Sequence, residues 1–195
     1  MNDMTIRAFI DANVFVASWT ADAILTFAEQ GFFEPRWTKL VEEEAKKAFK
    51  MVHACSTARA ERYFAAANRA FPYAYAEVDP ADFEGVSLPD PDDAHIVAGA
   101  KASNCDFIVT YNLKDFPADA LAPHGVRAVG PDEFLMRFAE ADPRGAIFAV
   151  RGLVAAKKRP PRTMETEIGG LRRNKLDRFA DFLASCYGVE ERCGS

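Results

Sequence analysis

The chain has 195 residues, 49% of them hydrophobic and 27% charged, so it can bury a real core and is not disordered as a whole. Its formal net charge of −5 is uneven, because residues 1–140 hold 13 basic against 22 acidic side chains, whereas residues 141–195 hold 11 against 7. No apolar run is long enough to cross a bilayer, and no signal peptide is evident. The four cysteines (Cys55, Cys105, Cys186 and Cys193) form no CxxC pair, so neither a zinc site nor a disulfide framework is expected. A cytoplasmic protein is therefore expected.

The first predicted strand, Ile6–Ile10, is followed at once by Asp11 and Asn13. In open α/β sheets, ligands bind at the carboxyl ends of the parallel strands. Asp11 therefore either caps the next segment or lines a cleft, and taken alone it favours the capping interpretation. A helix is expected next over residues 22–30, with Gly31 as its stop signal.

The following predicted helix carries three consecutive glutamates. Thr38 is a natural N-cap, and the helix is expected to run to about Val52. At 100° per residue, Glu43 lies opposite the apolar stripe and is expected in solvent, whereas Glu42 and Glu44 flank the stripe. Glu44 is thus one of two credible inward carboxylates. The alternative is that early helical glutamates only complement the helix dipole.

Two more elements precede a third acidic segment. A helix is predicted over residues 57–69, and a short strand over Tyr75–Val78. In the segment that follows, Asp90 is a natural N-cap and Pro91 suits the first helical position. Asp93 shares a helical face with the apolar residues three, four and seven positions later, so it is predicted to point toward the protein body.

A buried strand, Phe107–Val109, precedes Thr110, Asn112 and Asp115. Because Asp11 follows the first strand in the same way, strand–helix alternation can bring these side chains to one edge of a sheet. Unpaired carboxylates in one cleft repel one another, and a divalent cation removes that repulsion. Carboxylate and amide oxygens without a cysteine or histidine cluster suit Mg²⁺ or Mn²⁺ rather than zinc.

After a predicted edge strand at residues 125–129, the chain becomes helical. Residues 1–140 are expected to form an α/β domain, and residues 141–195 a helical C-terminal extension. That extension is predicted to contain helices at 144–158 and 174–187, interrupted by two adjacent glycines. Its basic residues either form a phosphate-binding surface or simply a solvated helical face.

Other catalytic patterns are not supported. None of the three histidines has a candidate partner in the sequence, so a histidine general base is not favoured, and a surface role is expected for His95. The chain has no glycine-rich phosphate loop and no serine in a nucleophile-elbow context.

Four motifs occur in a characteristic order: Phe9–Val14, Trp37–Thr38 with Val41 and Glu44, Leu88–Asp93, and Ile108–Pro117. Together they resemble the PIN-domain ribonucleases, in particular the VapC-like toxins of bacterial toxin–antitoxin pairs. The resemblance covers about residues 5–140. The C-terminal part resembles, more loosely, a helical extension that one subgroup carries.

This resemblance implies a three-layer α/β/α domain with a parallel sheet and a Mg²⁺- or Mn²⁺-dependent site that cleaves single-stranded RNA. Carried over by position, the acidic catalytic and metal-binding set is Asp11, Glu44, Asp93 and Asp115. Secondary positions are Asp90, Asn13, Thr110 and Asn112. Asn112 stands where many members have a further Asp, which leaves open whether Asn112 or Asp115 faces the metal.

The resemblance also implies a cognate antitoxin and often a homodimer. Basic residues of the extension would then contact RNA phosphates, with Lys157, Lys158, Arg159, Arg172 and Arg173 as candidates. A housekeeping PIN-like RNase without an antitoxin is the first alternative. A Mg²⁺-binding receiver-like signalling module ranks lower, because it should show an acidic pair after the first strand. A metal-independent interaction protein is the third.

Overall fold

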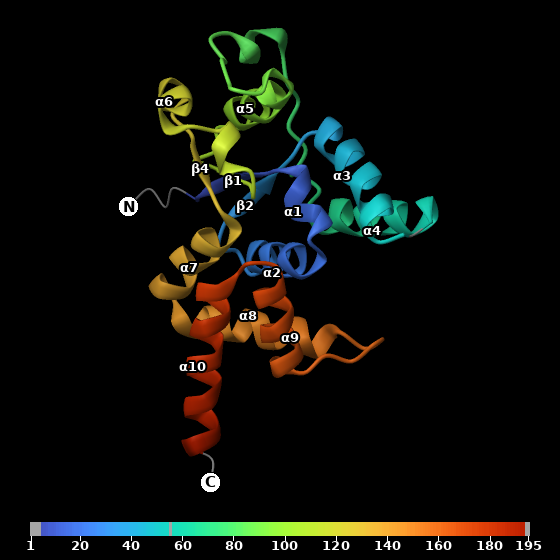
Figure 1. The fold of residues 1–195 in the computed structure, drawn as a ribbon, viewed down its shortest axis with the longest axis vertical. Coiled ribbons are helices and arrows are strands. Elements are labelled where there is room, and N and C mark those ends of the chain that lie inside the picture. Colours follow the sequence, from blue (N-terminus) through green and yellow to red (C-terminus); the bar gives the residue numbers. More distant parts are fainter. Residues whose placement is uncertain (1–4, 55, 194–195) are drawn as a thin grey trace. The chain divides into compact units, whose positions relative to one another are not determined.

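The computed structural model describes residues 5–54 and 56–193, which form two compact units (Figure 1). The sheet unit takes in the chain through Val16 together with Phe33–Gly130. The helical unit takes in Ala17–Phe32 together with the chain from Pro131 onward. The division of the sequence at residues 140 and 141 into two domains stays a prediction, because compactness does not show which segments fold on their own.

A parallel sheet of four strands, in the order β2-β1-β3-β4, organises the sheet unit. The strands are β1 (Arg7–Ile10), β2 (Glu34–Arg36), β3 (Phe107–Val109) and β4 (Arg127–Val129). The central strands β1 and β3 are apolar at almost every position because helices cover the sheet. The predicted α/β fold with a parallel sheet is therefore confirmed.

Helices surround this sheet within the same unit. Helix α5 packs against β1 and β3, α1 packs against α3, and α3 packs against α4. The α-helices of the unit are α1 (Ala12–Val16), α3 (Lys39–Val52), α4 (Thr57–Ala70), α5 (Ala94–Ala102) and α6 (Ala118–Leu121). Short 3-10 turns occupy Pro80–Phe83, Pro91–Asp93, Leu113–Asp115 and Ala122–His124.

Local sequence signals account for most of these elements. Thr38 caps α3 as predicted, since its Oγ1 accepts a hydrogen bond from the Val41 N–H at 3.3 Å. The predicted strand at Tyr75–Val78 is wrong, because only Tyr75 forms a bridge, to Trp37 just beyond the end of β2. Strand β2 itself was not predicted. Its central residue, Pro35, lacks an N–H and suits only an edge strand, which is where β2 lies.

Gly99 lies where α5 meets β1. A Cβ atom at this position would lie 2.5 Å from Cε2 of Phe9. We expect Gly99→Ala to lower the free energy of unfolding by about 1–3 kcal/mol, although alanine is the better helix former. Urea denaturation measures this. Gly152→Ala is the matched control, because a Cβ at Gly152 meets nothing within 4 Å, and it should stabilise the protein. A stabilising effect at both positions would contradict the packing argument.

The helical unit consists of five helices: α2 (Ser18–Glu29), α7 (Pro131–Ala141), α8 (Pro143–Ala156), α9 (Met164–Arg173) and α10 (Asp177–Cys193). Helix α2 packs against α7, α8 and α9, although it is far from them in sequence. Phe27 of α2 contacts Phe179 of α10 edge to face at a centroid distance of 5.5 Å. The helical C-terminal part expected from the sequence is confirmed.

The predicted interruption at Gly169-Gly170 is wrong, because α9 continues through both glycines. Gly170 instead allows a close approach: a Cβ there would lie 2.2 Å from Cδ2 of Trp19. None of the helices in the described residues is long and apolar enough to cross a membrane. Cys105 and Cys186 are free thiols. The signal-peptide and cysteine predictions also depend on parts of the chain outside the described residues, namely residues 1–4, Cys55 and the side chain of Cys193.

Candidate active site

The carboxyl ends of β1 and β3 hold the first acidic side chain in a fixed position. The Asp11 N–H donates to the carbonyl oxygen of Val109 at 3.1 Å, which ties the end of β1 to the end of β3. The Asp11 carboxylate is 8% exposed. Its Oδ2 accepts hydrogen bonds from Thr110 Oγ1 at 2.6 Å and from Asn13 Nδ2 at 2.5 Å. Asp11 is therefore a buried carboxylate with a defined orientation.

Asn13 and Thr110 are themselves held by the chain after β3. Asn13 Nδ2 also donates to Thr110 Oγ1 at 3.0 Å, and Asn13 Oδ1 accepts from the Tyr111 N–H at 3.1 Å. Thr110 Oγ1 accepts from the Asn112 N–H at 3.0 Å. This network links the segments after β1 and β3, so the two secondary positions Asn13 and Thr110 orient Asp11.

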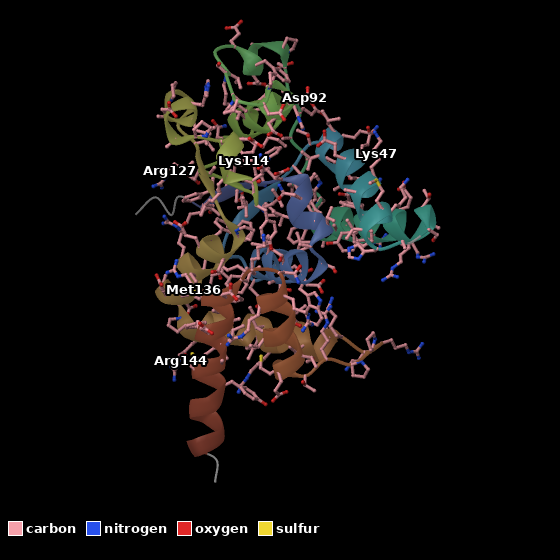
Figure 2. All side chains as sticks on the ribbon, in the orientation of Figure 1. Lys47, Asp92, Lys114, Arg127, Met136 and Arg144 are labelled. Atoms are coloured by element: carbon pink, nitrogen blue, oxygen red, sulfur yellow. The ribbon has the colours of Figure 1, made fainter. Side chains whose placement is uncertain are left out.

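Glu44 and Asp93 reach the same region from two helical segments, which Lys47 on α3 and Asp92 before α5 mark in Figure 2. Burial raises the pKa of Glu44, and the negative charges of Asp11 and Asp93 raise it further. Burial, followed by the charges of neighbouring acids that include Asp11 and Asp115, raises the pKa of Asp93 to about 6. The charges of Asp11 and Asp115 thus act on Asp93, and the charges of Asp11 and Asp93 act on Glu44.

Asp115 is the fourth carboxylate at this edge of the sheet, and the Asn112 side chain contacts it. Asn112 Nδ2 donates a hydrogen bond to Asp115 Oδ2. The Lys114 Nζ lies 4.0 Å from the other carboxylate oxygen, and the Asp115 side chain is 15% exposed. Because the charge of Asp115 contributes to the raised pKa of Asp93, Asp115 is the one of the pair that adds negative charge to the site. We call Asp11, Glu44, Asp93 and Asp115 the acidic cluster.

The remaining acids of these segments have other partners. Glu42 is 5% exposed and lies 2.5 Å from Lys46 Nζ. Although burial opposes ionisation, hydrogen bonds from Lys46, Tyr75 and Asn68 lower the pKa of Glu42. Asp90 caps the turn before α5 through the Asp92 N–H, at 3.0 Å. The structure therefore brings Glu44 rather than Glu42 toward Asp11 and Asp93; helix geometry alone left both glutamates open, and the family resemblance selected Glu44.

The donor chemistry of the cluster suits a hard divalent cation. Burial raises the pKa of Asp11 despite its hydrogen bonds, and no lysine or arginine in the described part of the chain forms an ion pair with Asp11 or Asp93. A cation would offset this uncompensated negative charge. Among the side chains that the structure describes, however, no three acids, histidines or cysteines already stand at metal-ligand spacing.

His95 was expected at the surface, but its side chain is only 13% exposed. Its Nε2 lies 3.3 Å from Glu44 Oε2, and burial lowers the pKa of the imidazole. Sequence spacing could not show this contact, because it joins α5 to α3. The only feature of the sequence that pointed to His95 as part of the site was its position two residues after Asp93.

The basic candidates of the extension all belong to the helical unit. Lys157 Nζ lies 2.7 Å from Asp22, Arg172 lies 2.7 Å from Asp181, and Arg173 lies over the Trp19 ring at 5.7 Å. Lys158 and Arg159 are exposed and form no ion pair with the described residues. Contact of any of these five residues with RNA stays a prediction.

Two family models match successive parts of this chain. The family model for the PIN domain matches residues 7–114, and the model for the VapC50 C-terminal domain matches residues 131–185. The protein "Putative ribonuclease VapC50" of Mycobacterium tuberculosis (strain ATCC 25618 / H37Rv) is 35% identical over 79 residues. That match covers 40% of this chain and 47% of that protein, so the chain spans about half the length of this curated relative. No solved structure matches.

Proposed function

Because this chain belongs to the PIN-domain family, we propose that it is an endoribonuclease that cleaves single-stranded RNA with the help of Mg²⁺ or Mn²⁺. The observation that supports this most is the acidic cluster at the carboxyl edge of β1 and β3, where burial and then the charges of neighbouring acids raise the pKa of Glu44 and of Asp93. A protein that used these acids only as caps or surface groups would gain nothing from holding them together without a cation. The PIN-domain match also disfavours a receiver-like module.

In this proposal, Asp11 and Asp93 hold the main ion, and Glu44 and Asp115 complete the set. A bound divalent cation supplies the activation of water and the stabilisation of the leaving oxygen. Asn13 and Thr110 keep the Asp11 carboxylate in one orientation by donating to its Oδ2. Glu44, with 43% of its side chain exposed, would help to position the ion or orient the attacking water.

We further propose that the protein is the toxin of a toxin–antitoxin pair that acts in the cytoplasm, is inhibited by a cognate antitoxin, and forms a homodimer. The support is the match of the C-terminal helices to the VapC50 C-terminal domain. In the bound state, the basic residues of the extension would neutralise RNA phosphates. A small neighbouring gene whose product inhibits the purified protein supports the toxin, whereas a housekeeping RNase would lack such a neighbour.

Cleavage of a labelled single-stranded RNA tests the central proposal. The purified chain should cut the RNA with Mg²⁺ or Mn²⁺, lose this activity in excess EDTA, and regain it when Mn²⁺ is restored. Unchanged cleavage in EDTA would contradict metal dependence. Cleavage of single-stranded DNA but not of RNA would contradict the substrate class.

Metal binding should also be visible without RNA. At about 100-fold excess over the dissociation constant, Mn²⁺ should stabilise the protein by about 2.7 kcal/mol, which raises Tm by about 5–10 °C in a domain of this size. Thermal unfolding with and without Mn²⁺ measures the shift. Asp93→Asn should lose most of it, whereas Asp119→Asn, an exposed acid of α6 outside the cluster, should keep it. An equal shift in both variants would place the ion elsewhere.

A further inference from the structure

His95 joins the two helical segments that carry Glu44 and Asp93. It lies in the first turn of α5, just after the 3-10 turn that ends at Asp93. Its Nδ1 is 3.4 Å from the carbonyl oxygen of Asp92, and its Nε2 is 3.3 Å from Glu44 Oε2 on α3. The imidazole therefore spans the gap between the turn before α5 and helix α3.

The Nε2 atom of His95 is sealed from solvent and makes no hydrogen bond of standard geometry with any described residue. A buried N–H without an aligned acceptor is unfavourable, so it draws the nearest acceptor toward it. Glu44 Oε2, within 4 Å, is such an acceptor. The Nε2 and Oε2 atoms are thus close enough to interact, but their angles do not meet those of a standard hydrogen bond.

Glu44 needs such a partner, because its acidic neighbours repel it. The charges of Asp11 and Asp93 act against a Glu44 carboxylate that turns toward them, and the cation that acts on it, Lys47, is exposed on α3. An N–H donor beside Glu44 restricts its rotation without adding a competing positive charge. The carboxylate has no proton to donate when ionised, so the neutral imidazole carries its one proton on Nε2, and the long 3.4 Å contact of Nδ1 with the Asp92 carbonyl oxygen is then not a hydrogen bond.

We propose that His95 is a positioning residue that donates from Nε2 to Glu44 and holds this carboxylate at the acidic cluster. This inference rests on the proposed function only for the role of Glu44 in RNA cleavage. The geometric claim, that His95 fixes a ligand side chain for the divalent ion, can be measured on the protein without substrate. Partners of this kind typically change metal affinity or activity by about 10–100-fold.

A double-mutant cycle tests the proposal. His95→Ala and His95→Gln are prepared in the full chain with Glu44 intact and again with Glu44→Ala. In each variant, kcat and KM are measured on a single-stranded RNA, and the Mn²⁺ dissociation constant is measured by calorimetry without RNA. Circular dichroism and thermal unfolding report whether each variant is folded.

With Glu44 intact, His95→Ala should lower kcat and weaken Mn²⁺ binding by about 10-fold, while KM for RNA changes by less than about 2-fold. His95→Gln, whose side-chain amide can donate from a similar position, should recover both values to within about 3-fold of the wild type. With Glu44→Ala, neither substitution of His95 should have a further effect.

Equal losses with and without Glu44 would overturn the proposal, since they would show that His95 acts through general stability. A His95→Gln variant as impaired as His95→Ala would overturn it as well. If the wild type fails to cleave RNA, the proposed function fails, but the Mn²⁺ cycle still decides whether His95 acts through Glu44. Should His95→Ala not fold, His95→Phe, which keeps a ring but has no N–H to donate, replaces it in both backgrounds and should show the same dependence on Glu44.

Discussion

Asp93→Asn is expected to reduce RNA cleavage by at least about 100-fold at saturating Mg²⁺ or Mn²⁺, with the fold intact. Burial, followed by the charges of four neighbouring acids, raises the pKa of Asp93 to about 6. Asparagine keeps its shape but removes the negative charge that would bind the cation. Single-turnover cleavage of a labelled RNA measures the loss.

Asp92→Asn is the matched control for this prediction. Asp92 is the preceding residue, it is exposed, and it lies in the same 3-10 turn. Its substitution removes the same charge from the same segment and should change the rate only a few-fold. Wild-type activity of Asp93→Asn would remove Asp93 from the mechanism. An equal loss in both variants would mean that the charge of the whole turn matters, rather than the position of one carboxylate.

Although Asp93→Asn should abolish most of the activity, it should stabilise the metal-free protein. The folded protein holds the Asp93 proton more tightly than the unfolded chain, since the pKa is about 6 instead of 3.8. The free energy of unfolding without metal therefore falls as the pH rises through this window. Asp93→Asn removes this penalty, so its Tm should exceed the wild-type value at pH 7.5 and match it below about pH 4. A lower Tm at pH 7.5 would contradict the repulsion argument.

The acidic cluster could be predicted from the sequence to the extent that local rules place each side chain. The helical repeat separated Glu44 from the solvated Glu43, and the strand ends predicted the positions of Asp11 and Asp115. What local rules could not supply was the contact between elements. The partner of His95 depends on how α5 packs beside α3, and neither helix encodes that angle in its own residues.

The errors in the predicted fold have the same origin. Gly169-Gly170 has the local signature of a helix stop, yet the packed Trp19 ring requires a glycine on a continuous helix. Tyr75–Val78 has strand composition, but β2 ends at Arg36. Only Tyr75 finds a partner, the bridge to Trp37 just after β2. Tertiary packing overrides intrinsic preference in both cases. The C-terminal helices were predictable because their apolar faces repeat with the helical period.

Arg162→Met is expected to destabilise the protein by about 3–5 kcal/mol, because it leaves a buried carboxylate without its partner. Glu167 is fully buried, and burial raises its pKa while the charge of Arg162 opposes this. Arg162 Nη1 lies 3.0 Å from both Glu167 Oε2 and Asp22 Oδ2. Its guanidinium also lies over the Trp19 ring at 3.7 Å, so a single side chain joins α2 to α9.

Urea denaturation of three variants separates the buried pair from simple loss of charge. Lys175→Met removes an exposed positive charge from the same unit and should change the free energy of unfolding by less than about 0.5 kcal/mol. Glu167→Gln removes the buried charge itself and should lose less than Arg162→Met. Lower pH should restore part of the stability of Arg162→Met, since protonation neutralises the stranded Glu167. Equal losses for Arg162→Met and Lys175→Met would show that Glu167 does not depend on Arg162, and that apolar packing alone holds α9 to α2.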